Sequence, residues 1–165
     1  MIPLRPAVFV LILLAAAACG SSAPLADGAA SPDALARAVL EAIRTNDRAG
    51  LARLAVSERE FREHVWPRLP ASRPERNLPF SYVWGELRQK SDAALAATIQ
   101  RYRGRLFEVM TVSFSRATDY VEYKVHREAT FRVRDSTGNE SDLRVCGSLL
   151  EKDGLWKVFS YVVDD

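Results

Sequence analysis

The sequence predicts an α+β domain in which helices from the first half of the chain pack on a bent antiparallel sheet from the second half. Apolar residues recur at helical spacing up to residue 102, and they alternate with polar residues from residue 106 onward. Helices followed by hairpin-connected strands are typical of this architecture. The chain has 165 residues, which suits one domain with a core of its own.

Three helical segments are expected before residue 67. Ser31 is suited to cap the first helix and Pro32 to begin it, and Asn46-Asp47 ends it. A short second helix is expected over residues 48–56. The pattern Ser57-Glu58-Arg59-Glu60 is a capping box, in which serine and glutamate each bond to a backbone N–H group, so it predicts the start of a third helix.

A loop and a long helix are expected next. Pro67 stops the third helix after Trp66, because the residue before a proline is disfavoured in the α conformation. Residues 67–79 are rich in proline and arginine and predict a loop. From Phe80 to Tyr102, apolar residues follow one face of a single amphipathic helix. Gly104 then suits the left-handed conformation that ends many helices.

The rest of the chain is expected to form four antiparallel strands: residues 106–114, 120–134, 143–150 and 155–163. Turns are expected at 117–119, 135–139 and 153–154, the last because Asp-Gly is a strong hairpin signal. The second strand is long enough to bend. Its alternating apolar row predicts one buried face, made of Tyr123, Val125, Ala129, Phe131 and Val133.

Arg127 lies in that same apolar row and is the main candidate for a functional side chain. A guanidinium buried alone is prohibitively costly, so Arg127 must be paired, with Glu108 and Glu86 as candidates, or must reach water. Three interpretations stay open. Arg127 packs its stem at the rim of the core with its charge paired or in solvent; or it lines a cavity and binds an anion; or a β-bulge turns it outward.

The N-terminus has the layout of a secretory signal peptide. Arg5 precedes an uninterrupted apolar run, Ala7 to Ala18, and Cys19 follows. A membrane-spanning helix needs about 20 apolar residues, so this run is too short to remain as one. We therefore expect residues 1–18 to be removed. Residues 19–33 are then expected to be a flexible tether, because they are small, polar and interrupted by proline.

The end of this segment, Ala16-Ala17-Ala18-Cys19, resembles the lipobox of bacterial lipoproteins. The resemblance implies that the thiol of Cys19 is joined to a diacylglycerol carrying chains such as palmitate, and that these acyl chains anchor the protein to the lipid bilayer. Gly20, in place of the aspartate that commonly signals inner-membrane retention, favours the outer membrane, with the domain facing the periplasm. The alternative is an ordinary secretory signal cleaved near Ala18, which leaves Cys19 a free thiol.

The order of elements and the last hairpin resemble the NTF2-like, or cystatin-like α+β, superfamily. The hairpin reads Lys-Asp-Gly-Leu-Trp-Lys-Val-Phe-Ser-Tyr over residues 152–161. The resemblance implies a cone-shaped NTF2-like domain over residues 34–165, with Trp156 and Val158 pointing into its concave core. That superfamily includes isomerase-like and dehydratase-like enzymes as well as noncatalytic envelope domains, so the fold does not select a function.

Three aromatic residues join Arg127 as candidates for ligand binding. Trp66, Trp84 and Tyr102 are expected on the helices that cover the sheet, where they either close a pocket around a ligand or belong to the core. His126 alternates with charged residues and is expected to be solvated, and His64 is expected to be packed or exposed without a function. No catalytic residue, metal site or cofactor is indicated by any motif.

The remaining cysteine and the charge balance limit the partners. Cys146 cannot pair with an acylated Cys19, so it is either a buried structural thiol or an exposed thiol for intermolecular pairing. The formal net charge is +2 and no block of five like charges occurs, so nucleic acid is not an expected partner.

The sequence favours a membrane-anchored envelope lipoprotein whose domain is a noncatalytic module for a small ligand or another envelope protein. The alternative is a small NTF2-like enzyme of the isomerase or dehydratase type, with a concave pocket around Arg127. A third possibility is an assembly component that forms a homodimer through its sheet.

Overall fold

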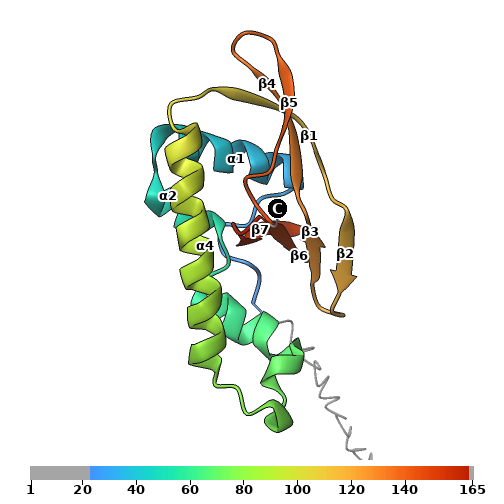
Figure 1. Cartoon of the computed structure of the whole chain (residues 1–165). Helices are drawn as coiled ribbons and strands as arrows, with labels where there is room; N and C mark the ends of the chain where they lie inside the picture. Colours follow the sequence, from blue (N-terminus) through green and yellow to red (C-terminus); the bar gives the residue numbers. More distant parts are fainter. Residues whose placement is uncertain (1–22, 164–165) are drawn as a thin grey trace, which may run out of the picture.

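The computed structural model of the chain describes residues 23–163 and has an α+β fold (Figure 1). The α-helices are α1 (Pro32–Thr45), α2 (Arg48–Leu54), α3 (Glu58–Glu60) and α4 (Phe80–Tyr102). The strands are β1 (Phe107–Ser113), β2 (Arg116–Asp119), β3 (Lys124–Arg127), β4 (Thr130–Asp135), β5 (Glu140–Leu143), β6 (Ser148–Lys152) and β7 (Leu155–Ser160). The α+β class predicted from the sequence is therefore confirmed.

The ends of the first helices follow the capping signals. The Ser31 side chain accepts a hydrogen bond from the Ala34 N–H at 3.1 Å, and Asn46 ends α1 in the left-handed conformation. The capping box between Ser57 and Glu60 is also present. After α3 the chain widens into a π-helix, η1 (Phe61–Val65), so the third predicted helix is only partly α-helical.

The segment predicted as a loop consists of short 3₁₀ turns. These are η2 (Trp66–Arg68), η3 (Pro70–Ser72) and η4 (Pro74–Arg76), and each has a proline in its first turn. Proline suits this position because its fixed φ is compatible with the turn and its missing N–H would be unpaired there. The long helix α4 has the bounds that the apolar pattern predicts, and Gly104 follows it with φ +76°.

The strands form two antiparallel sheets, in the orders β1-β4-β5 and β2-β3-β6-β7. The prediction of one continuous strand over 120–134 is wrong, because Glu128 adopts φ +55° and separates β3 from β4. Residues 117–119, predicted as a turn, belong to β2, and β5 was not predicted as a strand. Alternation alone does not locate such breaks, since Val125 before the bend and Ala129 and Phe131 after it are all buried.

Three chain segments pass from one sheet to the other, so the sheets meet along a line of bends. They bend between β1 and β2, between β3 and β4, and between β5 and β6. Backbone hydrogen bonds join the segments at this line. The Ser115 N–H donates to the Arg127 carbonyl at 3.2 Å, and the Glu128 N–H donates to the Gly147 carbonyl at 2.7 Å. The Gly147 N–H donates to the Ser160 carbonyl at 3.0 Å. These hydrogen bonds therefore fix the positions of the bent segments relative to one another.

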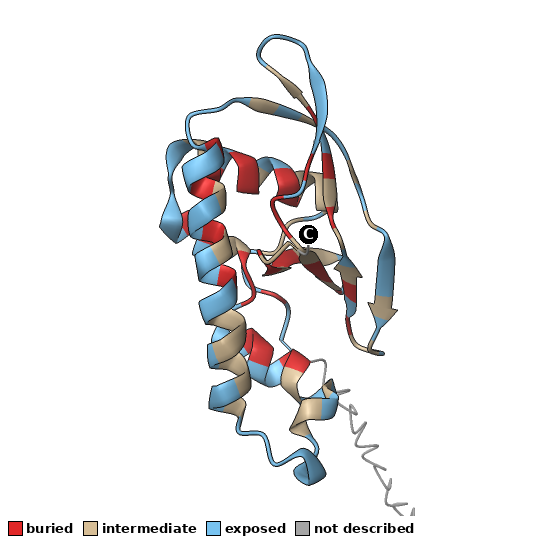
Figure 2. Ribbon diagram, in the orientation of Figure 1, coloured by how far each residue is buried: buried red, intermediate tan, exposed pale blue. Residues whose placement is uncertain are grey.

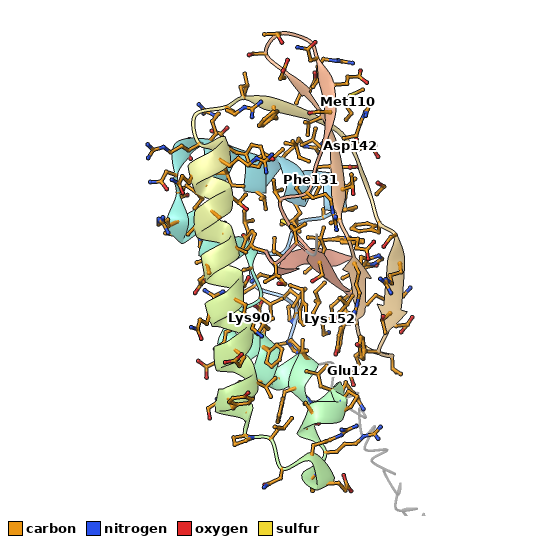
Figure 3. The ribbon with its side chains drawn as sticks, in the orientation of Figure 1. Lys90, Met110, Glu122, Phe131, Asp142 and Lys152 are labelled. Carbon is orange, nitrogen blue, oxygen red and sulfur yellow. The ribbon has the colours of Figure 1, made fainter. Side chains whose placement is uncertain are left out.

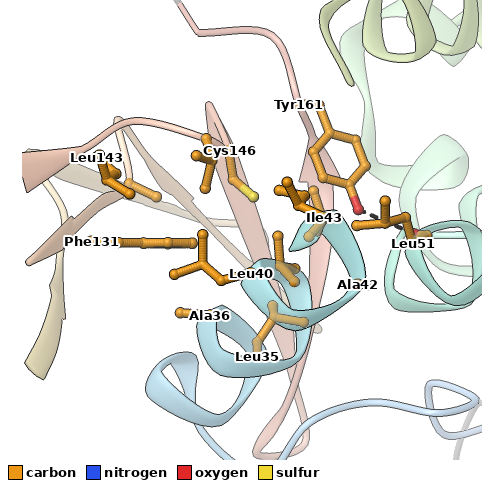
Figure 4. Close-up of a cluster of buried hydrophobic side chains, with 14 of the residues drawn as sticks. Leu35, Ala36, Leu40, Ala42, Ile43, Leu51, Phe131, Leu143, Cys146 and Tyr161 are labelled. Carbon is orange, nitrogen blue, oxygen red and sulfur yellow. Dashed lines mark hydrogen bonds between the residues drawn. The ribbon is translucent and has the colours of Figure 1, made fainter. Parts of the chain in front are cut away.

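Two apolar clusters fill the space between helices and sheets. The larger joins α1 and the second half of α4 to strands of both sheets, and Figure 4 shows its Leu35, Leu40 and Ile43 grouped with Phe131 and Cys146. The Tyr161 hydroxyl donates to the Leu51 carbonyl at 3.1 Å within it. The smaller cluster lies under η1 and the first half of α4. Figure 2 shows that buried residues concentrate on the inner sides of the elements.

The packed part of the chain begins before the residue-34 boundary expected from the sequence. Leu25 is buried in the smaller cluster, and Ala29 forms a β-bridge with Trp156. The Ala26 N–H also donates to a carboxylate oxygen of Glu60 at 2.8 Å. Residues 25–29 are thus part of the folded domain.

Candidate functional site

Each of the three bends places one arginine at the same depression. Arg116 is the first residue of β2, Arg127 is the last residue of β3, and Arg144 directly follows β5. All three are exposed, and they line an open depression of about 260 Å³. Its other lining residues are Val125, Glu128, Gly147, Ser148, Phe159, Ser160 and Val162. Among residues 23–163, the lining thus holds three cationic side chains and a single carboxylate.

Like charges face each other at this depression. Arg116 and Arg127 are directly opposite each other in neighbouring strands, and like charges in that position destabilise a sheet. Arg116 bonds Glu128 at 2.8 Å. Neither Arg127 nor Arg144 forms an ion pair with a carboxylate of residues 23–163. The depression therefore carries a surplus of positive charge.

Glu128 is held in its ionised form. A hydrogen bond from Arg116 and another from Ser115 lower the pKa of the Glu128 carboxyl, and the charges of Arg116 and Arg144 lower it further. A carboxylate with a lowered pKa is a weak base and a poor acid near neutral pH. Glu128 is thus better suited to orient Arg116 than to transfer protons.

Gly147 is required for the wall of the depression. A side chain at this position would place its Cβ 1.5 Å from the carbonyl oxygen of Val162. Glycine thus lets the connection between β5 and β6 approach the end of β7. The Ser160 hydroxyl accepts a hydrogen bond from the Val162 N–H at 3.1 Å, which leaves its own O–H available as a donor beside the depression.

The four residues predicted to bind a ligand are not gathered around one cavity. Arg127 lines the depression, but Trp66, Trp84 and Tyr102 are not among its lining residues. The rings of Trp84 and Phe61 lie 5.2 Å apart in the smaller cluster, and Trp66 meets Phe80 edge-on. Tyr102 belongs to the larger cluster, where its ring meets Phe107. A binding role for the three aromatics stays a prediction.

The expected partners of Arg127 are wrong. Glu108 pairs with Arg134 at 3.4 Å, and Glu86 pairs with Lys90 at 3.3 Å. Arg116 and Arg144, the other two arginines at the depression, were not singled out from the sequence. Their proximity to Arg127 depends on the bends, which the periodicity did not locate.

His126 is more enclosed than its polar neighbours predict. Its ring contacts the rings of Phe114 and Trp156, with centroid distances of 4.8 and 4.6 Å, and its Nε2 is 2.8 Å from a carboxylate oxygen of Glu151. The side chain is 15% exposed. The expectation of a solvated histidine is therefore wrong, because two aromatic rings cover it. It does not line the arginine depression.

The remaining candidates have structural surroundings. His64 is buried in η1, and both its ring nitrogens lack hydrogen-bond partners among residues 23–163. Cys146 is fully buried, and burial raises the pKa of its thiol, which agrees with the structural interpretation. Cys19 lies outside the described residues. Within residues 23–163 there is no group of three or more His, Cys, Asp or Glu residues placed to hold a metal ion.

Comparisons with protein-family models, with curated proteins and with solved structures give no match for this chain. Among the helices that the structure describes, none is both long enough and apolar enough to cross a bilayer.

Proposed function

We propose that the protein is an acylated envelope lipoprotein whose domain binds a small anion, without catalysing a reaction on it, at the depression lined by Arg116, Arg127 and Arg144. The supporting observation is the gathering of these three guanidinium groups around one carboxylate. Their mutual repulsion is relieved when a phosphate or carboxylate group enters, because guanidinium groups bind such anions through paired N–H donors.

The size of the depression limits the ligand. Pockets for drug-sized molecules span roughly 300 to 1,000 Å³, and this one holds about 260 Å³. The ligand is therefore a compact anion, or the anionic group of a larger molecule that extends into solvent. Val125, Phe159 and Val162 add an apolar wall that suits a carboxylate with a short hydrocarbon part.

The NTF2-like assignment belongs to the same proposal. It is supported by the order of the elements: three helical regions come first, and three chain segments that bend from one sheet to the other follow. The hairpin β6–β7 then completes the larger sheet. In that fold the bent sheet surrounds a cone. Here the inner side holds the larger apolar cluster, including the fully buried Leu149 and Phe131. The depression at the bends is the more accessible ligand site.

The alternative, an enzyme that uses Arg127 to orient its substrate, has weaker support. Proton transfer at neutral pH needs an acid or base with a suitably shifted pKa near the substrate. The pKa of Glu128 is lowered, and no histidine lines the depression. These observations favour binding over catalysis.

The proposal is tested by calorimetric titration of the protein with inorganic phosphate, acetate and citrate. We expect saturable binding of at least one of these anions, weakened about tenfold or more by Arg127→Gln or Arg144→Gln, since a hydrogen bond to a charged group contributes about 1.5–3 kcal/mol. Arg48→Gln, which removes an exposed arginine from α2, is the matched control and leaves binding unchanged.

Two results would count against the proposal. The anion site is refuted if all three anions fail to bind, or if the Arg48 variant weakens binding as much as the Arg127 variant. The lipid anchor is tested separately, by the intact mass of the protein extracted from membranes. A mass without acyl chains on Cys19 refutes the lipoprotein assignment and leaves the anion site untouched.

A further inference from the structure

One end of the domain concentrates exposed apolar residues and arginines. This end, called the basal end, comprises residues 66–82 and the β2–β3 turn at 120–122. Five large apolar side chains are exposed among the described residues, and three of them, Leu78, Tyr82 and Val121, belong to the basal end. Arg68 pairs with Glu122, which joins the two parts of this surface. Figure 3 shows Glu122 far from Met110 and Asp142 at the opposite end.

Val121 is unusual in both exposure and backbone conformation. The residue is 92% exposed, and its φ is +74°, a region that β-branched residues rarely adopt. The turn that holds it is fixed at its base: the rings of Tyr120 and Tyr123 stack at 4.8 Å, and the Asp119 carboxylate accepts from the Val121 N–H at 2.9 Å. An apolar residue is thus held out into solvent in a strained conformation, which is typical of a contact residue.

The arginines of the basal end include two without an ion pair. Arg59 and Arg62, which precede the basal end in α3 and η1, pair with Glu63 and Glu58. Arg73, between two 3₁₀ turns, and Arg76, in the last of them, are exposed and make no ion pair with any carboxylate of residues 23–163. The exposed Glu75 lies between them, so this segment keeps one surplus positive charge. Leu78 and Tyr82 follow them directly. Arginine beside exposed tyrosine and leucine is the composition of surfaces that lie at a membrane interface.

The N-terminal segment brings this end close to the proposed lipid anchor. Leu25 is buried in the smaller cluster with Val65, Tyr123 and the half-buried Trp66, so the chain enters the fold beside the basal end. Cys19 precedes Leu25 by six residues, and a fully extended chain of that length spans at most about 20 Å. In contrast, α4 begins at the basal end and runs to the opposite end of the domain, a length of about 33 Å. The anchor can therefore reach the basal end far more easily than the opposite end.

We infer that the basal end lies against an anionic lipid surface, with Arg73 and Arg76 at the headgroups and with Leu78, Tyr82 and Val121 inserted among them. This inference deepens the proposed function and rests on it, because it assumes that Cys19 carries the anchor. It fixes the orientation of the domain. The β4–β5 hairpin then points away from the membrane, as Figure 1 shows by its place opposite the segment 66–79.

The test uses the mature chain with Cys19→Ser, so that acyl chains do not contribute to binding. All described helices and strands lie after residue 30, well beyond the substituted position. Its binding is measured by cosedimentation with vesicles of pure phosphatidylcholine and of phosphatidylcholine mixed with anionic phosphatidylglycerol. We expect binding to the anionic vesicles alone. Arg73→Gln with Arg76→Gln weakens it about 25-fold, since each arginine near such a surface contributes about fivefold.

The matched control removes two arginines from the opposite end. Arg37 lies beside Arg105 and Leu106, and Arg103 follows α4, so Arg37→Gln with Arg103→Gln changes the net charge equally. We expect this pair to retain binding. Val121→Asn, which suits the left-handed backbone but removes the apolar side chain, weakens binding without loss of stability.

The outcomes separate the two proposals. Absence of binding to anionic vesicles, or equal weakening by both double variants, would overturn the basal-end inference even when the intact mass shows acyl chains on Cys19. Conversely, a mass without acyl chains, together with vesicle binding that requires Arg73 and Arg76, refutes the anchor but supports a lipid-binding basal end.

Discussion

Two groups of charged residues on one face of the larger sheet differ in their burial and in their partners. Lys157 in β7 pairs with Leu150 in β6, and Leu150 pairs with Val125 in β3. Arg127 follows Val125 by two residues in β3, so the side chains of Lys157 and Arg127 lie on the same face of the sheet. Lys157 is buried and bonds both carboxylate oxygens of Glu60, at 3.1 and 2.9 Å. Arg127 is exposed among other arginines. The first group satisfies its charges internally, and the second leaves a surplus for a ligand.

This difference separates structural charges from functional ones. Glu60 also accepts hydrogen bonds from the N–H groups of Ala26 and Ser57, so it joins the N-terminal segment, α3 and β7. Removing one member of such a pair leaves a buried charge uncompensated, which is costly. Removing an exposed arginine that repels its neighbours costs little. Stability measurements on the two groups are therefore expected to diverge.

The largest expected effect is at the buried pair. Lys157→Met leaves the Glu60 carboxylate without its cation and is expected to destabilise the fold by about 3–5 kcal/mol in urea unfolding. Arg127→Gln, the matched removal of one positive charge, is expected to change the free energy of unfolding by no more than about 0.5 kcal/mol. Equal losses for the two variants would contradict the distinction between the two groups.

The same pair gives a pH dependence. Burial would raise the pKa of the Glu60 carboxyl, but hydrogen bonds from Ser57 and Lys157 outweigh it and hold the pKa below its ordinary value of 4.5. A lowered pKa in the folded state means that this contribution to stability is present above pH 4.5 and is lost as the pH falls through the folded pKa. Glu60→Gln with Lys157→Met should flatten the acid limb of the stability curve, and an unchanged limb would exclude Glu60 as its source.

A smaller loss is expected where the bend packs against β7. Gly147→Ala is expected to cost about 1–3 kcal/mol, because its methyl group collides with the Val162 carbonyl and the surrounding backbone must shift. Gly85→Ala is the control: a methyl group there meets open space on α4, and alanine in a helix is favoured over glycine by about 0.5–1 kcal/mol. If Gly147→Ala were as stable as the wild type, the wall of the depression would not require glycine.

A gain of stability is expected at His64. Its two ring nitrogens are buried without a partner in the described part of the chain, and such groups cost about 1–3 kcal/mol each in desolvation. His64→Leu is therefore expected to stabilise the fold by about 1 kcal/mol in thermal and urea unfolding. His126→Leu, which removes the bond to Glu151, should instead destabilise it. A loss at His64 would indicate a polar partner for its ring.

The sequence predicted the local features of the fold better than its site. Helix ends at Ser31 and Ser57 follow from hydrogen bonds between residues close in sequence, so their capping patterns sufficed. The break at Glu128 was missed, because a positive φ in a non-glycine residue depends on packing of both sheets. Arg127 was found from its place in an apolar row. Arg116 and Arg144 reach it only through bends that pattern reasoning does not locate.

The most direct test of the anion site is a titration of the ¹⁵N-labelled protein with inorganic phosphate, followed by amide chemical shifts. We expect saturable shifts at Arg127, Glu128, Gly147 and Ser148, which border the depression, and their loss in the Arg127→Gln, Arg144→Gln double variant. Shifts that do not saturate, or that persist in the double variant, would contradict an anion site built from the three bends.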